Sequence, residues 1–337
     1  MYEDFYKLGR KPFQLSPDHR FFFNSSGHNR AMAYLRYGLG KGEGFIVITG
    51  GIGTGKSMLV ANLFAELSEQ DVVAAQLVST QVKEDDLLRM VCTSFGLNTD
   101  GQSKAGLLTE METFFRNCRA QGKRVLLVVD EAQNLPRSSI EELRMLSNFQ
   151  HEGQALLQSF LIGQAELKRT LAGAGMEQVR QRIIAGYHLR ALDLQEMRQY
   201  IEHRLTQAGW QGNPVLTEAA YERLHSATAG VPRRVNTLVD RLLLFGALEE
   251  LTTLDAGHVD TVVGEVAQEV GHSAPARDES KENASLLDQE QEPVHSDLAS
   301  RLEALEATVA RMQEQQLKDR KLLKKAILLQ MEIDADE

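Results

Sequence analysis

The stretch Gly50-Gly51-Ile52-Gly53-Thr54-Gly55-Lys56-Ser57 decides the fold, because it fits the pattern G-x-x-x-x-G-K-[ST] at every fixed position. An apolar run over 45–49 precedes it and indicates a buried strand. A helical pattern follows, with apolar residues on one face over 59–67. Strand, glycine-rich turn and helix in this order form the context that a phosphate-binding loop requires. A glycine turn that matches by chance would not explain that context.

Each part of this loop has a predicted task in holding a nucleoside triphosphate. The glycines let backbone N–H groups turn toward phosphate oxygens, and the following helix adds a favourable dipole. Lys56 is expected to reach the β- and γ-phosphates, and the Ser57 hydroxyl is expected to bind Mg²⁺. The predicted nucleotide-binding residues are Gly50, Gly51, Ile52, Gly53, Thr54, Gly55, Lys56, Ser57 and Met58. The predicted cofactors are therefore ATP and Mg²⁺.

The composition narrows the class of protein. The 337 residues suffice for two or three domains, and the 42% hydrophobic content is typical of a globular protein. No apolar run approaches the roughly 20 residues of a membrane span, and no secretory signal is visible. The only cysteines, Cys92 and Cys118, fit a reducing compartment and hence a cytoplasmic protein. The net charge of −10 argues against a general binder of polyanions.

Strands and helices alternate after the phosphate loop. Apolar runs predict four further strands, over 72–78, 124–130, 155–162 and 187–192. Helical patterns lie between them over 84–95 and 105–121, and Ser139-Ile140-Glu141-Glu142 predicts a capping box that opens another helix. This alternation predicts an α/β core over 45–193, with a five-stranded parallel sheet covered by helices on both faces.

An acidic pair ends the strand over 124–130. In a parallel sheet this strand end lies near the phosphate loop, where ligands bind. Asp130 is expected to hold Mg²⁺, mostly through water, and Glu131 to polarise the attacking water. An isolated Asp-Glu pair is often an ordinary surface feature. That alternative is weak here, because the chain also carries a phosphate loop that requires a partner for its metal.

Three further polar residues are candidates for catalysis. Gln164 follows the strand over 155–162 and could orient the lytic water, or it could simply form hydrogen bonds at the strand end. Arg180 and Arg182 precede the last strand, where an arginine can reach the nucleotide of a neighbouring subunit. Such an arginine finger can be worth about 10³–10⁵ in rate. A surface ion pair is the alternative for either arginine, and the sequence leans to Arg182 without deciding between them.

The chain is wholly helical from about residue 194 to 270, which predicts a lid. Four helices are expected, over 195–208, 217–228, 232–249 and 255–269. Thr217 and Asp255 have the side chains of N-caps. Arg233 follows Pro232 at a helix start and could touch the γ-phosphate from the lid. Alternatively, Arg233 and Arg234 only line a polar helix start.

The two ends of the chain differ from this core. Residues 1–44 carry aromatic side chains that could pack on an adenine ring or belong to the core. Residues 271–297 are polar and predict a disordered linker. Residues 298–331 predict a short coiled coil or amphipathic helix, because Leu298, Leu302, Leu305, Val309 and Met312 recur at heptad spacing. A basic stretch before residue 326 could touch a membrane or a partner, or it could be a solvated helix face.

The order of these motifs resembles that of AAA+ ATPases. Asp130-Glu131-Ala132-Gln133-Asn134-Leu135, Leu161-Ile162-Gly163-Gln164 and Gly230-Val231-Pro232-Arg233-Arg234 are similar to motifs of the general secretion pathway ATPase A (ExeA-like) group. The opening residues through His28-Asn29-Arg30 resemble the branch found beside exosortase (PEP-CTERM) and exopolysaccharide loci. The resemblance covers about residues 1–270 and leaves out the tail.

This resemblance implies nucleotide binding by the loop, roles for Asp130 and Glu131 on Mg²⁺ and water, and sensor roles for Gln164 and Arg233. It also implies an oligomeric ring, expected to be a hexamer, that serves a cell-envelope secretion or exopolysaccharide system through protein partners. The alternative is a DNA-binding ATPase of the transposition-regulator type, since the same group includes such proteins. A slow nucleotide-dependent switch is a third possibility, disfavoured by the intact Asp130-Glu131 pair.

Overall fold

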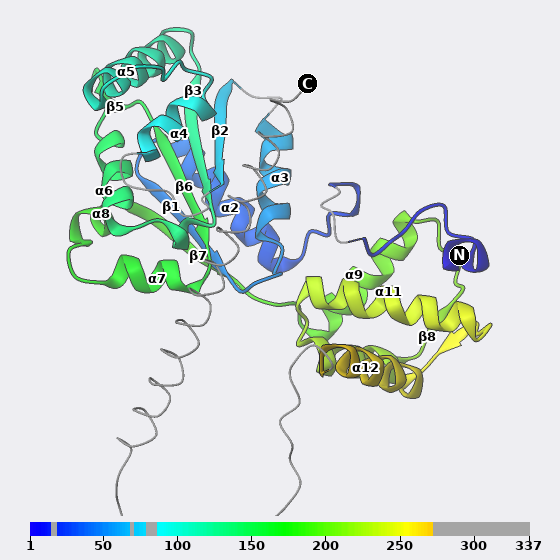
Figure 1. The fold of residues 1–337 in the computed structure, drawn as a ribbon. Coiled ribbons are helices and arrows are strands. Elements are labelled where there is room, and N and C mark those ends of the chain that lie inside the picture. The colour runs from blue at the N-terminus through cyan, green and yellow to red at the C-terminus, as the bar shows by residue number, and fades with distance from the viewer. Residues whose placement is uncertain (15–18, 68–70, 79–85, 272–337) are drawn as a thin grey trace, which may run out of the picture. The chain divides into compact units, whose positions relative to one another are not determined.

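The computed structural model describes residues 1–14, 19–67, 71–78 and 86–271, and its centre is a parallel sheet (Figure 1). Five strands lie in the spatial order β2-β3-β6-β1-β7, and every neighbouring pair is parallel. The strands are β1 (Phe45–Gly50), β2 (Val72–Val78), β3 (Arg124–Asp130), β6 (Gln158–Gly163) and β7 (Ile183–Leu189). The predicted five-stranded parallel sheet is therefore confirmed.

Helices cover both faces of this sheet, as predicted. On one face, Ile46 and Ile48 of β1 pack against α2 (Ser26–Lys41) and α3 (Lys56–Leu67). On the other face, Phe45 and Val47 pack in a second cluster. The helices of that cluster are α4 (Leu87–Ser94), α5 (Lys104–Ala120), α6 (Arg137–Leu146), α7 (Ala165–Ala172) and α8 (Glu177–Gln181). Because both faces are buried, the strands read as continuous apolar runs.

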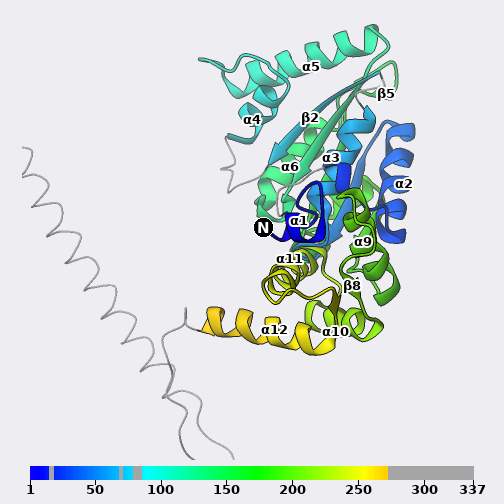
Figure 2. The ribbon, with the colours of Figure 1, turned by 90° about the vertical axis from the view of Figure 1, so that its right-hand side faces the viewer.

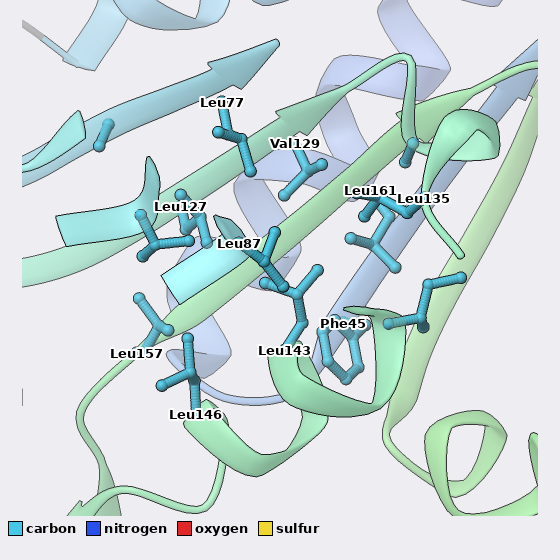
Figure 3. Packing of buried hydrophobic residues seen from close by; sticks show 14 of the residues in the cluster. Phe45, Leu77, Leu87, Leu127, Val129, Leu135, Leu143, Leu146, Leu157 and Leu161 are labelled. Atoms are coloured by element: carbon cyan, nitrogen blue, oxygen red, sulfur yellow. The ribbon is translucent and has the colours of Figure 1, made fainter. Parts of the chain in front are cut away.

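Leucines form much of the second cluster. Figure 3 shows Leu143 and Leu146 of α6 in the same cluster as Phe45 of β1 and Leu127 of β3. All four side chains are completely buried. This packing covers one face of the sheet across β3, β6 and β1, which include the strand that ends in the acidic pair and the strand that leads into the phosphate loop.

Strand order brings the motifs to one edge. β6 lies between β1 and β3, and all three strands run in the same direction. The carboxyl end of β1 leads into the phosphate loop, that of β6 into Gln164 and that of β3 into Glu131. Residues far apart in the sequence are therefore neighbours at one edge, where ligands bind in such sheets.

Four helices form the lid, as predicted. They are α9 (Leu194–Gln207), α10 (Glu218–Thr228), α11 (Pro232–Leu248) and α12 (Ala256–Gly271), with the short strands β8 (Val215–Leu216) and β9 (Thr253–Leu254). The N-caps are as expected, because the Thr217 hydroxyl accepts from the Ala220 N–H and Asp255 Oδ1 accepts from the His258 N–H. The lid has its own apolar core.

The first residues of the chain belong to that lid core. Tyr2 and Tyr6 of α1 (Tyr2–Tyr6) are buried there, together with Phe13 and Phe21. Phe21 ends the short 3₁₀ helix η1 (His19–Phe21). Figures 1 and 2 both place α1 beside α11. These first residues therefore stabilise the lid, whereas α2, which follows them, packs on the sheet.

Some predicted boundaries are wrong. The helix α6 begins at Arg137, so Ser139 lies inside it, buried and without a hydrogen-bond partner for its hydroxyl, instead of opening a capping box. The expected strand over 155–162 is interrupted, because a hairpin of β4 (Gln150–His151) and β5 (Gln154–Ala155) precedes β6. Strand β7 covers Ile183–Leu189 instead of 187–192, because pairing with β1 begins near Phe45.

The predicted linker and coiled coil lie outside the described residues, apart from Gly271 at the end of α12. Within the described part of the chain, no helix combines the length and apolar character that a membrane crossing demands.

Candidate functional site

The phosphate loop joins the end of β1 at Gly50 to the start of α3 at Lys56. Gly53 and Gly55 have φ values of 78° and 98°, a left-handed region that side chains with a Cβ rarely adopt. The Thr54 hydroxyl donates to the carbonyl of Gly51 at 2.9 Å. The glycines and this bond together give the loop the tight turn that directs backbone N–H groups toward an anion.

Lys56 reaches back over the loop. Its ammonium donates to the carbonyls of Gly50 and Gly51 at 3.0 and 2.9 Å. Burial lowers the pKa of Lys56, and the nearby carboxylates of Glu131 and Asp130 oppose that shift. The positive charge therefore sits inside the loop, where it can meet the charge of a bound phosphate.

Asp130 ends β3 and is buried, with only 5% of its surface exposed. Its Oδ1 accepts the backbone N–H of Glu131 at 2.9 Å. Burial raises the pKa of Asp130, and that hydrogen bond acts in the opposite sense. A buried carboxylate is costly unless it is paired or binds a metal, so Asp130 is suited to a cation.

The donor set here fits Mg²⁺. Ser57 is exposed at the start of α3, and Asp130 is the carboxylate at the end of β3, which is separated from β1 by β6. Among the described residues, no group of three or more His, Cys, Asp or Glu side chains forms a cage for a metal. Mg²⁺ does not require one, because it is usually bound by one or two carboxylates, waters and substrate phosphates.

Glu131 stands in an unusual backbone position, with φ of 51°. Its Oε2 accepts from Gln133 Nε2 at 2.6 Å and from Gln164 Nε2 at 3.4 Å. Gln133 lies in the 3₁₀ helix η3 (Ala132–Asn134). No sequence pattern predicted a role for Gln133, although it falls within the motif that follows Asp130.

The lid closes over the phosphate loop at Arg233. The Arg233 N–H donates to the Gly53 carbonyl at 3.2 Å. A Cβ added to Gly53 would lie 2.7 Å from the Arg233 Cβ, so only glycine permits this approach. Nine predicted residues line one cavity of about 290 Å³: Ile52, Gly53, Gly55, Lys56, Ser57, Met58, Glu131, Gln164 and Arg233.

A smaller cavity of about 40 Å³ adjoins the first and shares Gly55 and Met58 with it. Phe22 lines this cavity and meets the His28 ring edge-on at 5.6 Å. The His28 Nδ1 lies 2.7 Å from the Ser25 hydroxyl, and burial lowers the pKa of His28. The core role expected for the aromatic segment is confirmed at Phe21, and packing on an adenine ring stays a prediction for Phe22.

Two lid residues at the cavity were missed by the sequence analysis. Tyr200 and Arg204 of α9 are buried and line both cavities. Arg204 donates from Nε to the Pro12 carbonyl at 2.6 Å and from Nη1 to the Tyr200 hydroxyl at 3.0 Å. That hydroxyl donates to Asn236 Oδ1 at 2.7 Å. No short motif signals these contacts, because they join segments far apart in sequence.

The structure places both finger candidates outside the two cavities. Arg180 donates to the carbonyls of Leu171 and Gly173 and pairs with Glu177. Arg182 donates to the Ser147 carbonyl at 3.3 Å and to Asn148.

The arrangement of loop, acidic strand end and lid is suited to binding the phosphates of a nucleotide. The family model described as the AAA domain matches residues 39–171. The matched stretch runs from the end of α2 to α7, so most of the α/β core matches an AAA domain.

One curated relative is similar to most of this chain. The chain is 37% identical over 246 residues to general secretion pathway protein A of Aeromonas hydrophila. The aligned region covers 72% of this chain and 44% of the relative. The chain thus spans less than half the length of that protein. This similarity agrees with the expected resemblance to secretion ATPases of the ExeA-like group.

Solved structures share the fold at low sequence identity. The ORC2 protein of Aeropyrum pernix superposes with a TM-score of 0.54 at 17% identity, covering 74% of this chain and 72% of that one. Cdc6p of Pyrobaculum aerophilum gives 0.56 at 14% identity, covering 78% and 74%. These likenesses concern the fold alone.

Proposed function

We propose that this ATPase hydrolyses ATP with Mg²⁺ to drive assembly or export in a cell-envelope secretion system. The observation that carries the proposal is the 37% identity to general secretion pathway protein A over 72% of the chain. Within cell-envelope secretion, we propose an exopolysaccharide or PEP-CTERM-type system as the one that this protein serves. The resemblance of the opening segment to that branch supports it.

In this proposal the predicted site residues have separate roles in binding and hydrolysing ATP. The loop over 50–58 surrounds the phosphates with N–H groups, and Lys56 supplies positive charge. Ser57 and Asp130 hold Mg²⁺, which neutralises charge on the phosphate oxygens when bound. Glu131 polarises the attacking water and Gln164 helps to orient it. Arg233 of the lid responds to the γ-phosphate.

The proposal includes an oligomer with shared sites. Arg182 is the preferred finger, because Arg180 is committed to two carbonyls and Glu177 of its own chain. The hydrogen bonds of Arg182 go to Ser147 and Asn148, without a carboxylate. We expect a ring, taken to be a hexamer, on the cytoplasmic side of the envelope, where the tail could touch the membrane or a partner.

The first test measures ATP turnover per subunit against protein concentration, with and without duplex DNA. Turnover per subunit that rises with concentration and ignores DNA supports a self-assembling ATPase. Turnover that appears only with DNA would overturn the secretion proposal in favour of a transposition-type ATPase. Lys56→Ala is the control for contaminating activity.

A mixing experiment tests the shared site. Arg182→Ala and Glu131→Gln subunits are each expected to be inactive alone. When mixed, an interface can combine Glu131 from one subunit with Arg182 from the other, so turnover should reappear. No recovery in the Arg182 mixture, but recovery with Arg180→Ala, would move the finger to Arg180.

Crosslinked affinity capture tests the secretion role. Glu131→Gln is expected to hold ATP and keep its partners, whereas Lys56→Ala should not bind nucleotide. Envelope export proteins enriched with Glu131→Gln over Lys56→Ala would support the proposal. Enrichment of nucleic-acid proteins instead, with normal export in a Glu131→Gln strain, would contradict it.

A further inference from the structure

Gln133 occupies a connecting position at the catalytic edge of the sheet. Its Nε2 donates to Glu131 Oε2 at 2.6 Å, and its Oε1 accepts the backbone N–H of Gln164 at 2.8 Å. One amide therefore joins the end of β3 to the end of β6. These two strand ends carry the residues proposed to activate and orient the water.

The two carboxylate oxygens of Glu131 differ in their hydrogen-bond partners. Oε2 is held by the amides of Gln133 and Gln164, at 2.6 and 3.4 Å. Within the described residues Oε1 has no hydrogen-bond partner, although Glu131 lines the nucleotide cavity. A carboxylate anchored through one oxygen cannot rotate freely about its terminal torsion, so the other oxygen is presented in one orientation.

The surroundings of Gln133 are shaped for this bridge. Ala132, which precedes it in η3, is completely buried in the core and fixes the backbone. Gly163, at the end of β6, has no side chain to obstruct the amide. A Cβ added there would lie 2.7 Å from Gln133 Oε1 and 3.2 Å from its backbone nitrogen. The backbone before Gln133 is thus fixed by the burial of Ala132, and its amide lies against Gly163.

We infer that Gln133 is a positioning residue for ATP hydrolysis, which holds Glu131 Oε2 so that Oε1 is free to polarise water. The inference rests on the proposed role of Glu131 as the water-activating base. Losing the anchor lets the carboxylate rotate, and small misplacements of a catalytic group can cost about 10²-fold in rate. Nucleotide binding does not depend on this bridge, because Gln133 does not line the cavity.

Two variants separate the two bonds of the amide. Gln133→Ala removes both. Gln133→Glu keeps an oxygen that can accept the Gln164 N–H, but an ionised carboxylate cannot donate to Glu131. We expect kcat to fall about ten- to hundredfold in both variants, while KM for ATP and the affinity for a fluorescent ADP change by less than about twofold. Gln154→Ala, at an exposed glutamine of β5, is the matched control and should leave kcat unchanged.

A merely structural bond would give a different result. It would lower the unfolding temperature and raise KM together, or Gln133→Glu would retain the wild-type kcat; either outcome overturns the inference. Glu131→Gln measured alongside distinguishes failure of the inference from failure of the proposed base. If Glu131→Gln hydrolyses ATP as fast as wild type, the assignment of Glu131 as the base fails. If Glu131→Gln is inactive but the Gln133 variants keep the wild-type kcat, the positioning role of Gln133 fails.

A double-variant cycle gives an independent check. Gly163→Ala should displace the Gln133 amide and lower kcat in the wild-type background. In the Gln133→Ala background the displaced oxygen is already gone, so the same change should cost much less. Additive effects would mean that Gly163 and Gln133 act separately, which would contradict the bridge.

Discussion

The sheet edge and the lid contribute to the same cavity in opposite ways. At the sheet edge, Lys56, Asp130 and Glu131 are each held by hydrogen bonds from their own neighbourhood. On the lid, the Arg233 backbone N–H binds Gly53, but within the described residues the Arg233 guanidinium has no hydrogen bond or ion pair. The three residues at the sheet edge are held in place before nucleotide binds, whereas the guanidinium of Arg233 is not held by other described residues.

This difference indicates how the work is divided. Charged groups fixed before the reaction need no reorganisation when charge develops, which favours catalysis. A free guanidinium can instead report which nucleotide is bound, because a γ-phosphate gives it a partner. We therefore expect changes at the sheet edge to affect turnover, and changes at the lid to affect the distinction between ATP and ADP.

The largest expected effect is on the rate of ATP hydrolysis, when Glu131 or Lys56 at the sheet edge is replaced. Glu131→Gln should reduce single-turnover hydrolysis by about 10²–10⁴, the usual contribution of a general base, with nucleotide affinity retained. Lys56→Ala should abolish binding itself. Rapid-quench hydrolysis and fluorescent-nucleotide titration measure the two properties. Equal loss of binding in both variants would remove the distinction between the two residues.

A smaller effect is expected at the lid. Arg233→Ala should weaken ATP more than ADP, because a hydrogen bond to a charged group contributes about 1.5–3 kcal/mol and only ATP has a γ-phosphate. Arg234→Ala is the matched control, since Arg234 is equally exposed but does not line the nucleotide cavity. Competition titrations of ATP against ADP supply the measurement. Equal weakening of ATP and ADP would show that Arg233 does not sense the γ-phosphate.

The smallest effect concerns stability at the sheet edge. Burial raises the pKa of Asp130 in the folded state, so its ionised form opposes folding at neutral pH; this penalty shrinks as pH falls through the folded pKa and is gone below the unfolded pKa. Asp130→Asn should therefore unfold at a higher urea concentration than wild type at pH 7.5 without Mg²⁺ and nucleotide, and the gap should narrow as the pH is lowered toward the unfolded pKa of Asp130. Asp71→Asn, at an exposed position, should show neither effect. A less stable Asp130→Asn would mean that the bond from Glu131 outweighs burial.

Much of the fold could be predicted because its signals are local. The glycines of the phosphate loop, the apolar run into Asp130 and the caps at Thr217 and Asp255 each depend on nearby residues, and the structure has these elements. The errors lie where tertiary contacts override local patterns. Ser139 resembles a cap but is buried within α6, and β7 begins early because β1 is available to pair with it.

The sequence by itself determined the class of chemistry, since a phosphate loop followed by an acidic strand end requires only spacing and residue type. Only the tertiary structure decided how these parts are completed. It placed the Gln133 amide between Glu131 and Gln164, brought Arg233 against Gly53, and put Tyr200 and Arg204 at the cavity wall. The physical reason is that hydrogen bonds and close packing between distant segments depend on strand order and helix placement, which no local pattern encodes.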